Sequence, residues 1–131
     1  MIERQIAARG LDDPKLLAAF RAVPREQFVS ADYAGYAYQD SPLPIESGQT
    51  ISQPYIVALT IYAAGIGPGD KVLEVGAGSG YAAAVIGQIA GEIVAIERHH
   101  GERHRSGQSG ARQSAADDRG GRCERRCRSG R

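Results

Sequence analysis

The spacing of hydrophobic residues predicts helices in the first half of the chain. Ile2 and Ile6 lie four residues apart and Gly10 follows them, which predicts a short helix at the start. Asp13 and Pro14 predict the start of a second helix, because an Asp side chain accepts backbone N–H groups and proline suits the first turn. The apolar face predicted for this second helix consists of Leu16, Leu17, Ala19 and Phe20.

A third helix is predicted after a long irregular stretch. Residues 24–54 contain proline and glycine at short intervals and are predicted to be mostly loop. The segment from Thr50 to Pro54 predicts a helix start, and Gly65 is expected to close that helix. The face predicted for it consists of Ile56, Leu59 and Ala63, with Ile61 and Tyr62 beside them.

The second half of the chain has the pattern of one β-α-β unit. Residues 71–75 and 92–97 are short apolar runs that predict strands, and the alanine-rich residues 81–90 predict a helix between them. A crossover helix of this kind predicts that the two strands are parallel. The predicted fold class is therefore α/β, with a helical N-terminal segment followed by a single βαβ unit.

Composition and charge change abruptly near residue 100. The 131-residue chain has a net charge of +1, but residues 1–100 carry 7 Lys and Arg against 11 Asp and Glu, a net charge of −4. Residues 101–131 carry 9 Arg against 4 Asp and Glu, a net charge of +5, and hold no large apolar side chain. A segment of this composition cannot bury a core, so residues 101–131 are predicted to be a disordered tail.

Two features bear on cellular location. No apolar run approaches the roughly 20 residues of a membrane span, and the N-terminus lacks the apolar stretch of a signal peptide. Both cysteines, Cys123 and Cys127, lie in the tail, so no disulfide is expected in the apolar part of the chain. These features predict a cytoplasmic protein without a membrane partner.

The turn between the first predicted strand and its helix has the composition of a nucleotide-binding loop. Glycines at positions 76, 78 and 80 allow positive φ and let the backbone approach a ligand closely. Glu97 ends the second strand 21 residues after Gly76, where nucleotide-binding folds place an acidic residue on the ribose hydroxyls. A tight turn without a ligand is the alternative for the loop, and a solvated charge is the alternative for Glu97.

The order of the glycines separates two cofactor classes. The dinucleotide fingerprint needs a glycine at position 81, where this chain has Tyr81. The observed pattern, Glu74-x-Gly76-x-Gly78-x-Gly80, is similar to motif I of S-adenosylmethionine-dependent methyltransferases. The resemblance implies S-adenosylmethionine as the cofactor.

A longer motif resembles one family among these enzymes. Residues 42–58, and above all the run GQTISQP at positions 48–54, resemble the signature of the protein-L-isoaspartate O-methyltransferase family. The resemblance also covers residues 3–5, 23–29 and 72–98. It implies an incomplete Rossmann-like methyltransferase fold. The helical and substrate-side segment would be residues 1–66, the partial cofactor-binding unit residues 67–100, and the tail residues 101–131.

The resemblance also implies an activity and a set of site residues. The family transfers a methyl group from S-adenosylmethionine to the α-carboxylate of isoaspartyl residues, which is a protein-repair reaction. Ser52 matches the active-site serine, which would orient the substrate carboxylate, and a helix N-cap is the alternative for it. The residues matched to cofactor contacts are Thr50, Ile51, Ser52, Glu74, Gly76, Gly78, Ser79, Gly80, Glu97 and Arg98.

The resemblance extends to partners. It implies isoaspartyl-containing proteins and peptides as substrates and a monomeric protein without a bound metal. Tyr33, Tyr36, Tyr38 and Tyr55 could line the substrate side, with plain packing as the alternative. Cys123 and Cys127 form a single C-x3-C pair without a recognisable partner pair, so no zinc site with His99, His100 or His104 is expected.

The chain departs from the family pattern after Arg98. Arg/Gly/Ser-rich sequence replaces the next helix and strands of the family, a change that a reading-frame shift in a GC-rich gene would produce. Methyl transfer needs both the cofactor and the substrate to be held in line, and the family elements that follow the second strand take part in this. The 131-residue chain alone is therefore expected to be inactive. Its strand at residues 71–75 is expected to keep an open edge. The competing interpretation is a non-catalytic fragment whose basic tail binds nucleic acid weakly or binds nothing.

Overall fold

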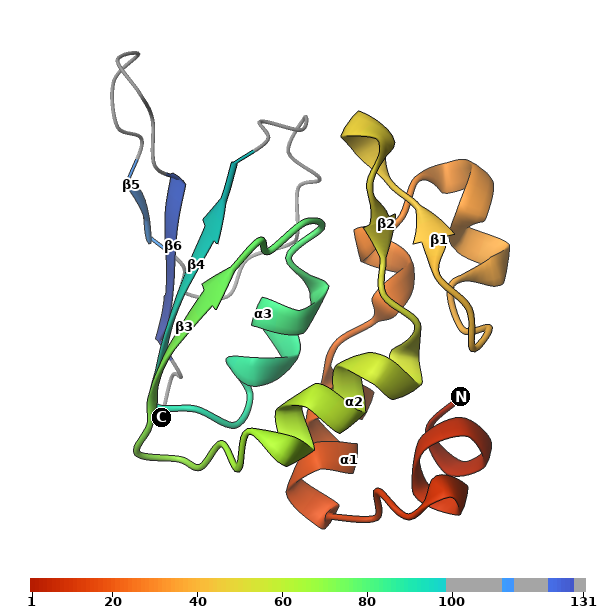
Figure 1. Ribbon diagram of the computed structural model, residues 1–131, viewed down its shortest axis with the longest axis horizontal. Coiled ribbons are helices and arrows are strands. Elements are labelled where there is room, and N and C mark those ends of the chain that lie inside the picture. Colours follow the sequence, from red (N-terminus) through yellow and green to blue (C-terminus); the bar gives the residue numbers. More distant parts are fainter. Residues whose placement is uncertain (99–111, 115–122, 129–131) are drawn as a thin grey trace.

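The computed structural model describes residues 1–98, 112–114 and 123–128 (Figure 1). A sheet lies on one side of the molecule and the N-terminal helices lie on the other (Figure 1). Helix α3 (Tyr81–Ile86) lies between them and contacts both helix α1 (Pro14–Ala22) and strand β4 (Glu92–Glu97). One core of buried apolar side chains therefore runs through both parts of the molecule.

The predicted N-terminal helix is present but is wound differently from an α-helix. A π-helical turn, η1 (Ile2–Ile6), is followed by a 3-10 turn, η2 (Ala7–Arg9). Gly10 ends the stretch with a φ of 89°, a left-handed conformation that favours glycine.

Helix α1 confirms the prediction made from Asp13 and Pro14. The Asp13 carboxylate accepts the backbone N–H groups of Lys15 and Leu16, both at 2.9 Å, so it satisfies two donors that a helix start leaves unpaired. The predicted apolar face is buried and consists of Leu16, Leu17, Ala19 and Phe20.

Helix α2 (Pro54–Ala63) forms where predicted, but the face predicted for its core contact is wrong. Ile56, Leu59 and Ala63 are exposed, as is Tyr62 beside them, whereas Ile61 is buried as predicted. The other buried residues are Pro54, Val57 and Ala58. The helix is apolar on nearly all sides, so its sequence does not mark the face that turns inward. Packing against α1 and η1 decides that face instead.

The stretch between α1 and α2 is mostly irregular, as predicted. It contains three 3-10 turns, η3 (Arg25–Phe28), η4 (Ala31–Tyr36) and η5 (Glu46–Gly48). It also contains a small hairpin that the sequence analysis does not predict. Strand β1 (Leu43–Pro44) pairs antiparallel with β2 (Thr50–Ile51).

The βαβ unit is confirmed. Strand β3 (Lys71–Val75) pairs parallel with β4, with Lys71 opposite Glu92 and Val75 opposite Ile96. Helix α3 is shorter than predicted, since it ends at Ile86 and turns complete the connection to β4. Within the described residues β3 is an edge strand, so its open edge is as expected.

The tail differs from its prediction at two places. Strands β5 (Arg112–Ser114) and β6 (Cys123–Arg128) extend the sheet in the order β3-β4-β6-β5, and β6 pairs antiparallel with β4. Strand pairing uses main-chain groups, so a segment without apolar side chains can still occupy the free edge of β4. The other residues of the predicted tail, and His99, His100 and His104 with them, lie outside the described residues.

Candidate functional site

The glycine loop follows β3 and is tied to the end of β4. Gly76, Gly78 and Gly80 have φ values of 82°, 52° and 81°, so all three positions need the left-handed freedom of glycine. The N–H groups of Gly76 and Ala77 both donate to the carbonyl of Ile96, at 2.7 and 3.2 Å. The loop is therefore held over the carboxyl ends of two parallel strands, where α/β folds bind ligands.

Glu97 reaches the loop directly. Its Oε2 accepts the N–H of Gly78 at 2.7 Å, across 19 residues of sequence. The structure therefore brings this carboxylate and the glycine loop together, as the spacing from Gly76 predicts. Arg98, the next residue, is exposed.

Glu74 lies on the more buried face of β3, together with Val72. It is opposite Ala95 in the strand register, one pleat before Glu97 on the neighbouring strand. Burial raises the pKa of the Glu74 carboxyl from 4.5 to about 7, and the nearby charge of Glu97 adds to the increase. Its Oε2 is buried without a hydrogen-bond partner in the structure. The base of the loop therefore holds two carboxyl groups, one of which titrates near neutral pH.

Ser79 and Gly80 complete the loop at the start of α3. The Ser79 hydroxyl accepts the N–H of Tyr81 at 3.4 Å, and Gly80 donates its N–H to Ala77 O at 2.7 Å. These bonds shape the turn, so the matched residues Gly76, Gly78, Ser79 and Gly80 belong to one continuous turn, in which Gly80 is buried.

The β1–β2 hairpin lies against this loop, a contact that the sequence does not predict. A Cβ added to Gly78 would lie 3.6 Å from Ile45 Cδ1 and 3.8 Å from Gln49 Oε1. Ile45 and Gln49 are joined by a bond from Ile45 N to Gln49 O at 2.9 Å. The only sequence signal is the Ser47-Gly48 turn between them, where Ser47 has a φ of 59°.

The stretch from Thr50 to Ser52 leads from this hairpin into α2. Thr50 and Ser52 are exposed, and Ile51 is buried. The alternative role of Ser52 as an N-cap is wrong, because the cap position is Gln53 and no side chain caps this helix start. The carbonyl of Ser52 accepts a hydrogen bond from Arg25 Nη2 at 2.7 Å. Ser52 thus lies on an exposed turn, and its backbone carbonyl is bonded to the buried Arg25.

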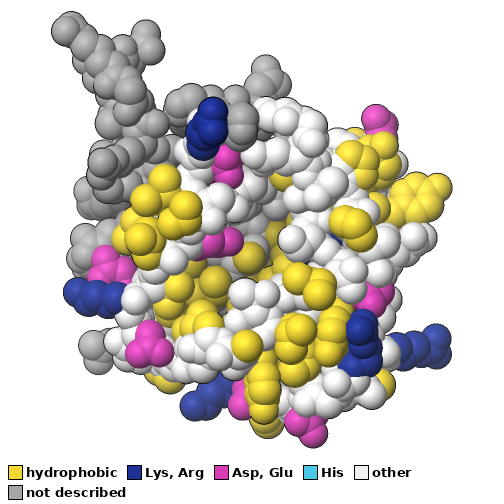
Figure 2. All heavy atoms as spheres, viewed as in Figure 1, with side chains coloured by type: hydrophobic (Ala, Val, Ile, Leu, Met, Phe, Trp, Pro, Cys, Tyr) yellow, Lys and Arg dark blue, Asp and Glu magenta, His cyan; other side chains and the backbone are white. Residues whose placement is uncertain are grey.

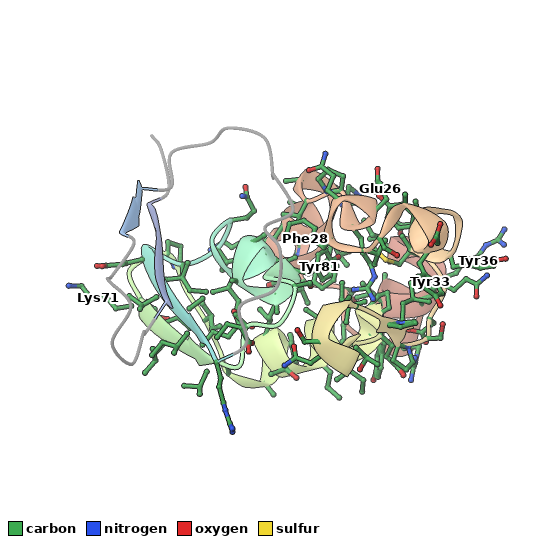
Figure 3. The ribbon with its side chains drawn as sticks, turned by 90° about the horizontal axis from the view of Figure 1, so that it is seen from above. Glu26, Phe28, Tyr33, Tyr36, Lys71 and Tyr81 are labelled. Atoms are coloured by element: carbon green, nitrogen blue, oxygen red, sulfur yellow. The ribbon has the colours of Figure 1, made fainter. Side chains whose placement is uncertain are left out.

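The tyrosines predicted as candidates for the substrate side occupy different environments. Tyr33 is partly buried against the core, whereas Tyr36 is exposed and points outward (Figure 3). The hydroxyl of Tyr38 donates to the carboxylate of Glu26. The ring of Tyr55 lies under the guanidinium of Arg9, with 3.2 Å between Cζ and the ring centroid.

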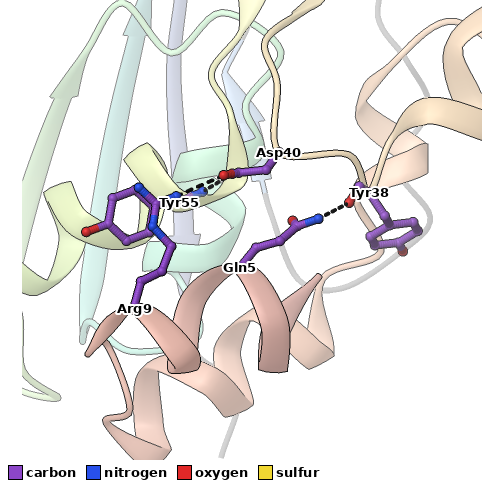
Figure 4. A network of polar contacts seen from close by, with 5 residues as sticks. All are labelled: Gln5, Arg9, Tyr38, Asp40 and Tyr55. Carbon is purple, nitrogen blue, oxygen red and sulfur yellow. Dashed lines mark hydrogen bonds and ion pairs between the residues drawn. The ribbon is translucent and has the colours of Figure 1, made fainter.

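The contacts of Tyr55 belong to a polar network that joins the N-terminus to the start of α2 (Figure 4). Asp40 accepts hydrogen bonds from Arg9 Nη1 at 2.9 Å and from the Tyr55 N–H at 3.3 Å. Gln5 Nε2 donates to the carbonyl of Tyr38 at 3.0 Å. These contacts support the packing alternative for Tyr55.

Residues 1–98, 112–114 and 123–128 contain neither a candidate metal site nor a candidate membrane span. No group of three or more His, Cys, Asp and Glu side chains in these ranges could hold a metal ion. No helix in them is long and apolar enough to cross a membrane.

Comparison with known proteins connects this geometry to a family. The family model described as Protein-L-isoaspartate(D-aspartate) O-methyltransferase matches residues 1–116. The chain belongs to this family. The glycine loop, Glu97 and the hairpin residues all lie inside the matched range.

Curated relatives match the N-terminal three quarters of the chain. The protein-L-isoaspartate O-methyltransferase of Methylorubrum extorquens is 62% identical over 99 residues, which are 76% of this chain and 43% of that protein. The enzyme of the same name from Protochlamydia amoebophila is 56% identical over 99 residues, which are 47% of its length. The chain therefore spans less than half the length of these relatives.

Solved structures confirm the Rossmann-like methyltransferase fold. A protein-L-isoaspartate O-methyltransferase from Plasmodium falciparum, solved in complex with S-adenosyl-L-homocysteine, has a TM-score of 0.63 and is 26% identical. The match covers 75% of this chain and 47% of that one. A second structure of the same enzyme name has a TM-score of 0.63 at 33% identity, over 74% of this chain and 34% of its own.

Proposed function

We propose that this chain carries the cofactor loop and the carboxylate-orienting serine of an enzyme that transfers a methyl group from S-adenosylmethionine to isoaspartyl residues. The observation that carries the proposal is the bond from Gly78 N–H to Glu97, which joins the two halves of an adenosyl-binding motif. The family match and the solved relative with S-adenosyl-L-homocysteine support the same cofactor class. The proposed site comprises the matched loop residues, Glu97, Arg98 and the Thr50–Ser52 turn.

The loop has the shape that a close-binding adenosyl ligand requires. Gly76 and Gly78 leave two positions of the loop without a side chain, and a Cβ at Gly78 would enter the space between the loop and the hairpin. Glu97 lies at the base of the loop, and a carboxylate there favours a ligand that bears a sulfonium cation. Glu74 adds to this charge only in its ionised form, because its pKa is raised to about 7. The residues present therefore fit this ligand.

The proposed reaction requires little acid or base chemistry from the protein. S-adenosylmethionine supplies an activated methyl group, and the substrate carboxylate is itself the nucleophile. The part left to this chain is alignment, which accounts for a large share of such rate enhancements. The exposed Ser52 hydroxyl can donate a hydrogen bond to one carboxylate oxygen and so fix the direction in which the other oxygen points.

The cofactor assignment is tested by calorimetry of the 131-residue chain with S-adenosyl-L-homocysteine. We expect weak binding by the wild type and none by Gly78→Val, because the added side chain enters the space between the loop and the hairpin and the left-handed φ strains the backbone. Gly69→Val is the matched control, since Gly69 has open space around its Cβ position and no left-handed φ. Equal binding by wild type and Gly78→Val, or binding of NADH in place of the adenosyl ligand, would contradict the assignment.

The substrate assignment is tested by methyl transfer to a peptide that contains isoaspartate, with the same peptide containing aspartate as control. The enzyme used joins residues 1–98 to the remaining C-terminal part of the Methylorubrum extorquens relative, which extends beyond the matched region. We expect methylation of the isoaspartyl peptide only. Ser52→Ala should lower kcat while leaving the affinity for S-adenosyl-L-homocysteine largely intact, and an inactive fusion would count against the assignment.

A further inference from the structure

Arg25 is the only charged side chain that is fully buried in the part of the chain that the structure describes. A guanidinium removed from water costs free energy unless its donors find partners. Burial lowers the pKa of Arg25, although the nearby Tyr81, Asp40 and Tyr38 oppose this effect. No part of the proposed reaction uses Arg25 directly, so its burial calls for another explanation.

The guanidinium joins segments that are distant in sequence. Nε donates to the carbonyl of Ala37, and Nη2 donates to the carbonyl of Ser52, each at 2.7 Å. Both bonds are short and charge-assisted, and the planar guanidinium fixes their relative direction. The backbone of Ser52 is therefore bonded to a buried side chain, although Ser52 itself is exposed.

The same guanidinium lies against Tyr81, the first residue of α3. Its Cζ is 4.7 Å from the centroid of the Tyr81 ring, within the range of a cation–π contact. The ring makes an edge-on contact with Phe28 at a centroid distance of 5.4 Å (Figure 3). A second edge-on contact is made with Phe20 at 6.1 Å. Tyr81 directly follows the glycine loop, so Arg25 touches the first residue after that loop.

Two buried polar side chains meet at this contact, the guanidinium of Arg25 and the hydroxyl of Tyr81. The charge of Tyr81 and a hydrogen bond between the two side chains favour the charged form of Arg25 and oppose the lowering of its pKa by burial. A side chain needed only for packing could be apolar at this position. Arg25 instead connects Tyr81 with the backbone of Ser52.

We propose that Arg25 is a positioning residue that holds Ser52 in register with the glycine loop through its contact with Tyr81. The inference rests on the proposed function, because that function gives Ser52 and the loop their roles. Arg25 touches neither substrate nor cofactor in this proposal. It fixes the distance between the hydroxyl that orients the carboxylate and the loop that holds the methyl donor.

The first test needs no ligand and uses hydrogen exchange of the 131-residue chain. Arg25→Lys keeps the charge but loses the planar fork, and should raise exchange in residues 50–57 about tenfold. Tyr81→Leu removes both the ring and the hydroxyl and should also raise exchange in residues 50–57, whereas Tyr81→Phe, which keeps the ring, should raise it less than Tyr81→Leu does. In the Arg25→Lys background, Tyr81→Leu should add no further increase there.

Arg21→Lys is the matched control, since Arg21 is an exposed arginine of α1 that pairs with Glu3 at the surface. It should leave exchange in residues 50–57 unchanged. Effects of Tyr81→Leu confined to residues 77–90 would overturn the proposal. If Tyr81→Leu does not fold, the Arg25→Lys comparison decides: an effect confined to residues 23–40 would overturn the proposal equally.

The second test measures the affinity for S-adenosyl-L-homocysteine at a temperature where circular dichroism shows each variant folded. Arg25→Lys should weaken binding about tenfold, and Arg21→Lys should not change it. In the active fusion described above, Arg25→Lys should lower kcat more than it raises KM. A variant that is merely less stable would keep wild-type affinity and kinetics once folded, and that result would overturn the proposal. Loss of binding by the wild type would instead refute the cofactor assignment and leave the exchange result standing.

Discussion

Strands β3 and β4 are neighbours in one sheet, yet they are buried to very different extents. In β4, Ile93 is 0% exposed and Ala95 is 2% exposed. In β3, Leu73 is 61% exposed and Val75 is 76% exposed, and Figure 2 shows hydrophobic side chains gathered on the surface over this strand. Both strands are short apolar runs in the sequence, so hydrophobicity alone does not explain the difference.

The difference comes from what covers each strand. The parallel register places Val72 and Glu74 beside Ile93 and Ala95, on the face that packs towards the core. Leu73 and Val75 point to the opposite face, which no described helix covers. β4 also has a strand on each side, whereas β3 has one open edge. A parallel strand is thus stabilised by its neighbours more than by its own composition.

The largest expected effect is a contrast between Ile93→Ala and Leu73→Ala. Ile93→Ala should lower the free energy of unfolding by about 3 kcal/mol, because it leaves a cavity in the core. Leu73→Ala should lower it by about 0.5 kcal/mol or less, since most of that side chain already faces solvent. Urea denaturation of both variants measures the difference, and equal losses would mean that β3 is covered in solution.

The second largest expected effect is a loss of stability when a side chain is added at Gly91, directly before β4. A Cβ at Gly91 would lie 2.8 Å from the carbonyl oxygen of Pro68, a backbone atom that cannot move aside easily. Gly91 and Glu92 also donate their N–H groups to the carbonyl of Asp70, at 3.0 and 3.1 Å. Gly91→Ala should therefore cost about 2 kcal/mol of stability through overpacking.

Gly69→Ala is the control for this steric effect, because nothing lies within 4 Å of its Cβ position. Its free energy of unfolding should stay within about 0.5 kcal/mol of the wild-type value. A Gly91→Ala variant as stable as Gly69→Ala would show that the turn from Pro68 to Asp70 can shift to accommodate a methyl group.

The third expected effect is a pH dependence that originates on the covered face of β3. Burial, with a further contribution from Glu97, raises the pKa of Glu74 from 4.5 to about 7. Between these values the folded state binds more protons than the unfolded state, so stability falls as pH rises from about 4.5 to 7. Solvent screening of this half-buried group limits the total to about 1 kcal/mol.

Glu74→Gln isolates this contribution. The variant should gain about 1 kcal/mol over wild type at pH 8 and no more than a few tenths at pH 4, measured by urea denaturation. Glu97→Gln should weaken the pH dependence without abolishing it, because burial is the larger cause. If the free energy of unfolding changed with pH by the same amount in wild type, Glu74→Gln and Glu97→Gln, the assignment of the pH dependence to Glu74 would be contradicted.

The difference between β3 and β4 also illustrates which features the sequence alone predicts and which it does not. Local signals predict the Asp13 cap, the limits of β3 and β4 and the approach of Glu97 to the loop, because each depends on residues close in sequence or on a standard βαβ path. The buried face of α2 is missed because that helix is apolar all round. Ile45, Gln49 and Arg25 are missed because their contacts with the loop and with Ser52 are tertiary and leave no periodic signal.

The smallest expected effect on stability comes from Leu73→Lys, and it tests the open edge of β3. A lysine at an exposed edge position keeps the strand's own contacts but discourages pairing with another chain. Stability should stay within about 0.5 kcal/mol of wild type, while self-association at rising protein concentration should decrease in sedimentation velocity. Leu59→Lys, an equivalent change at an exposed site on α2, controls for added charge. If both lysines reduced association equally, net charge and not the β3 edge would be responsible. If neither did, the exposed apolar face of β3 would not be a site of association.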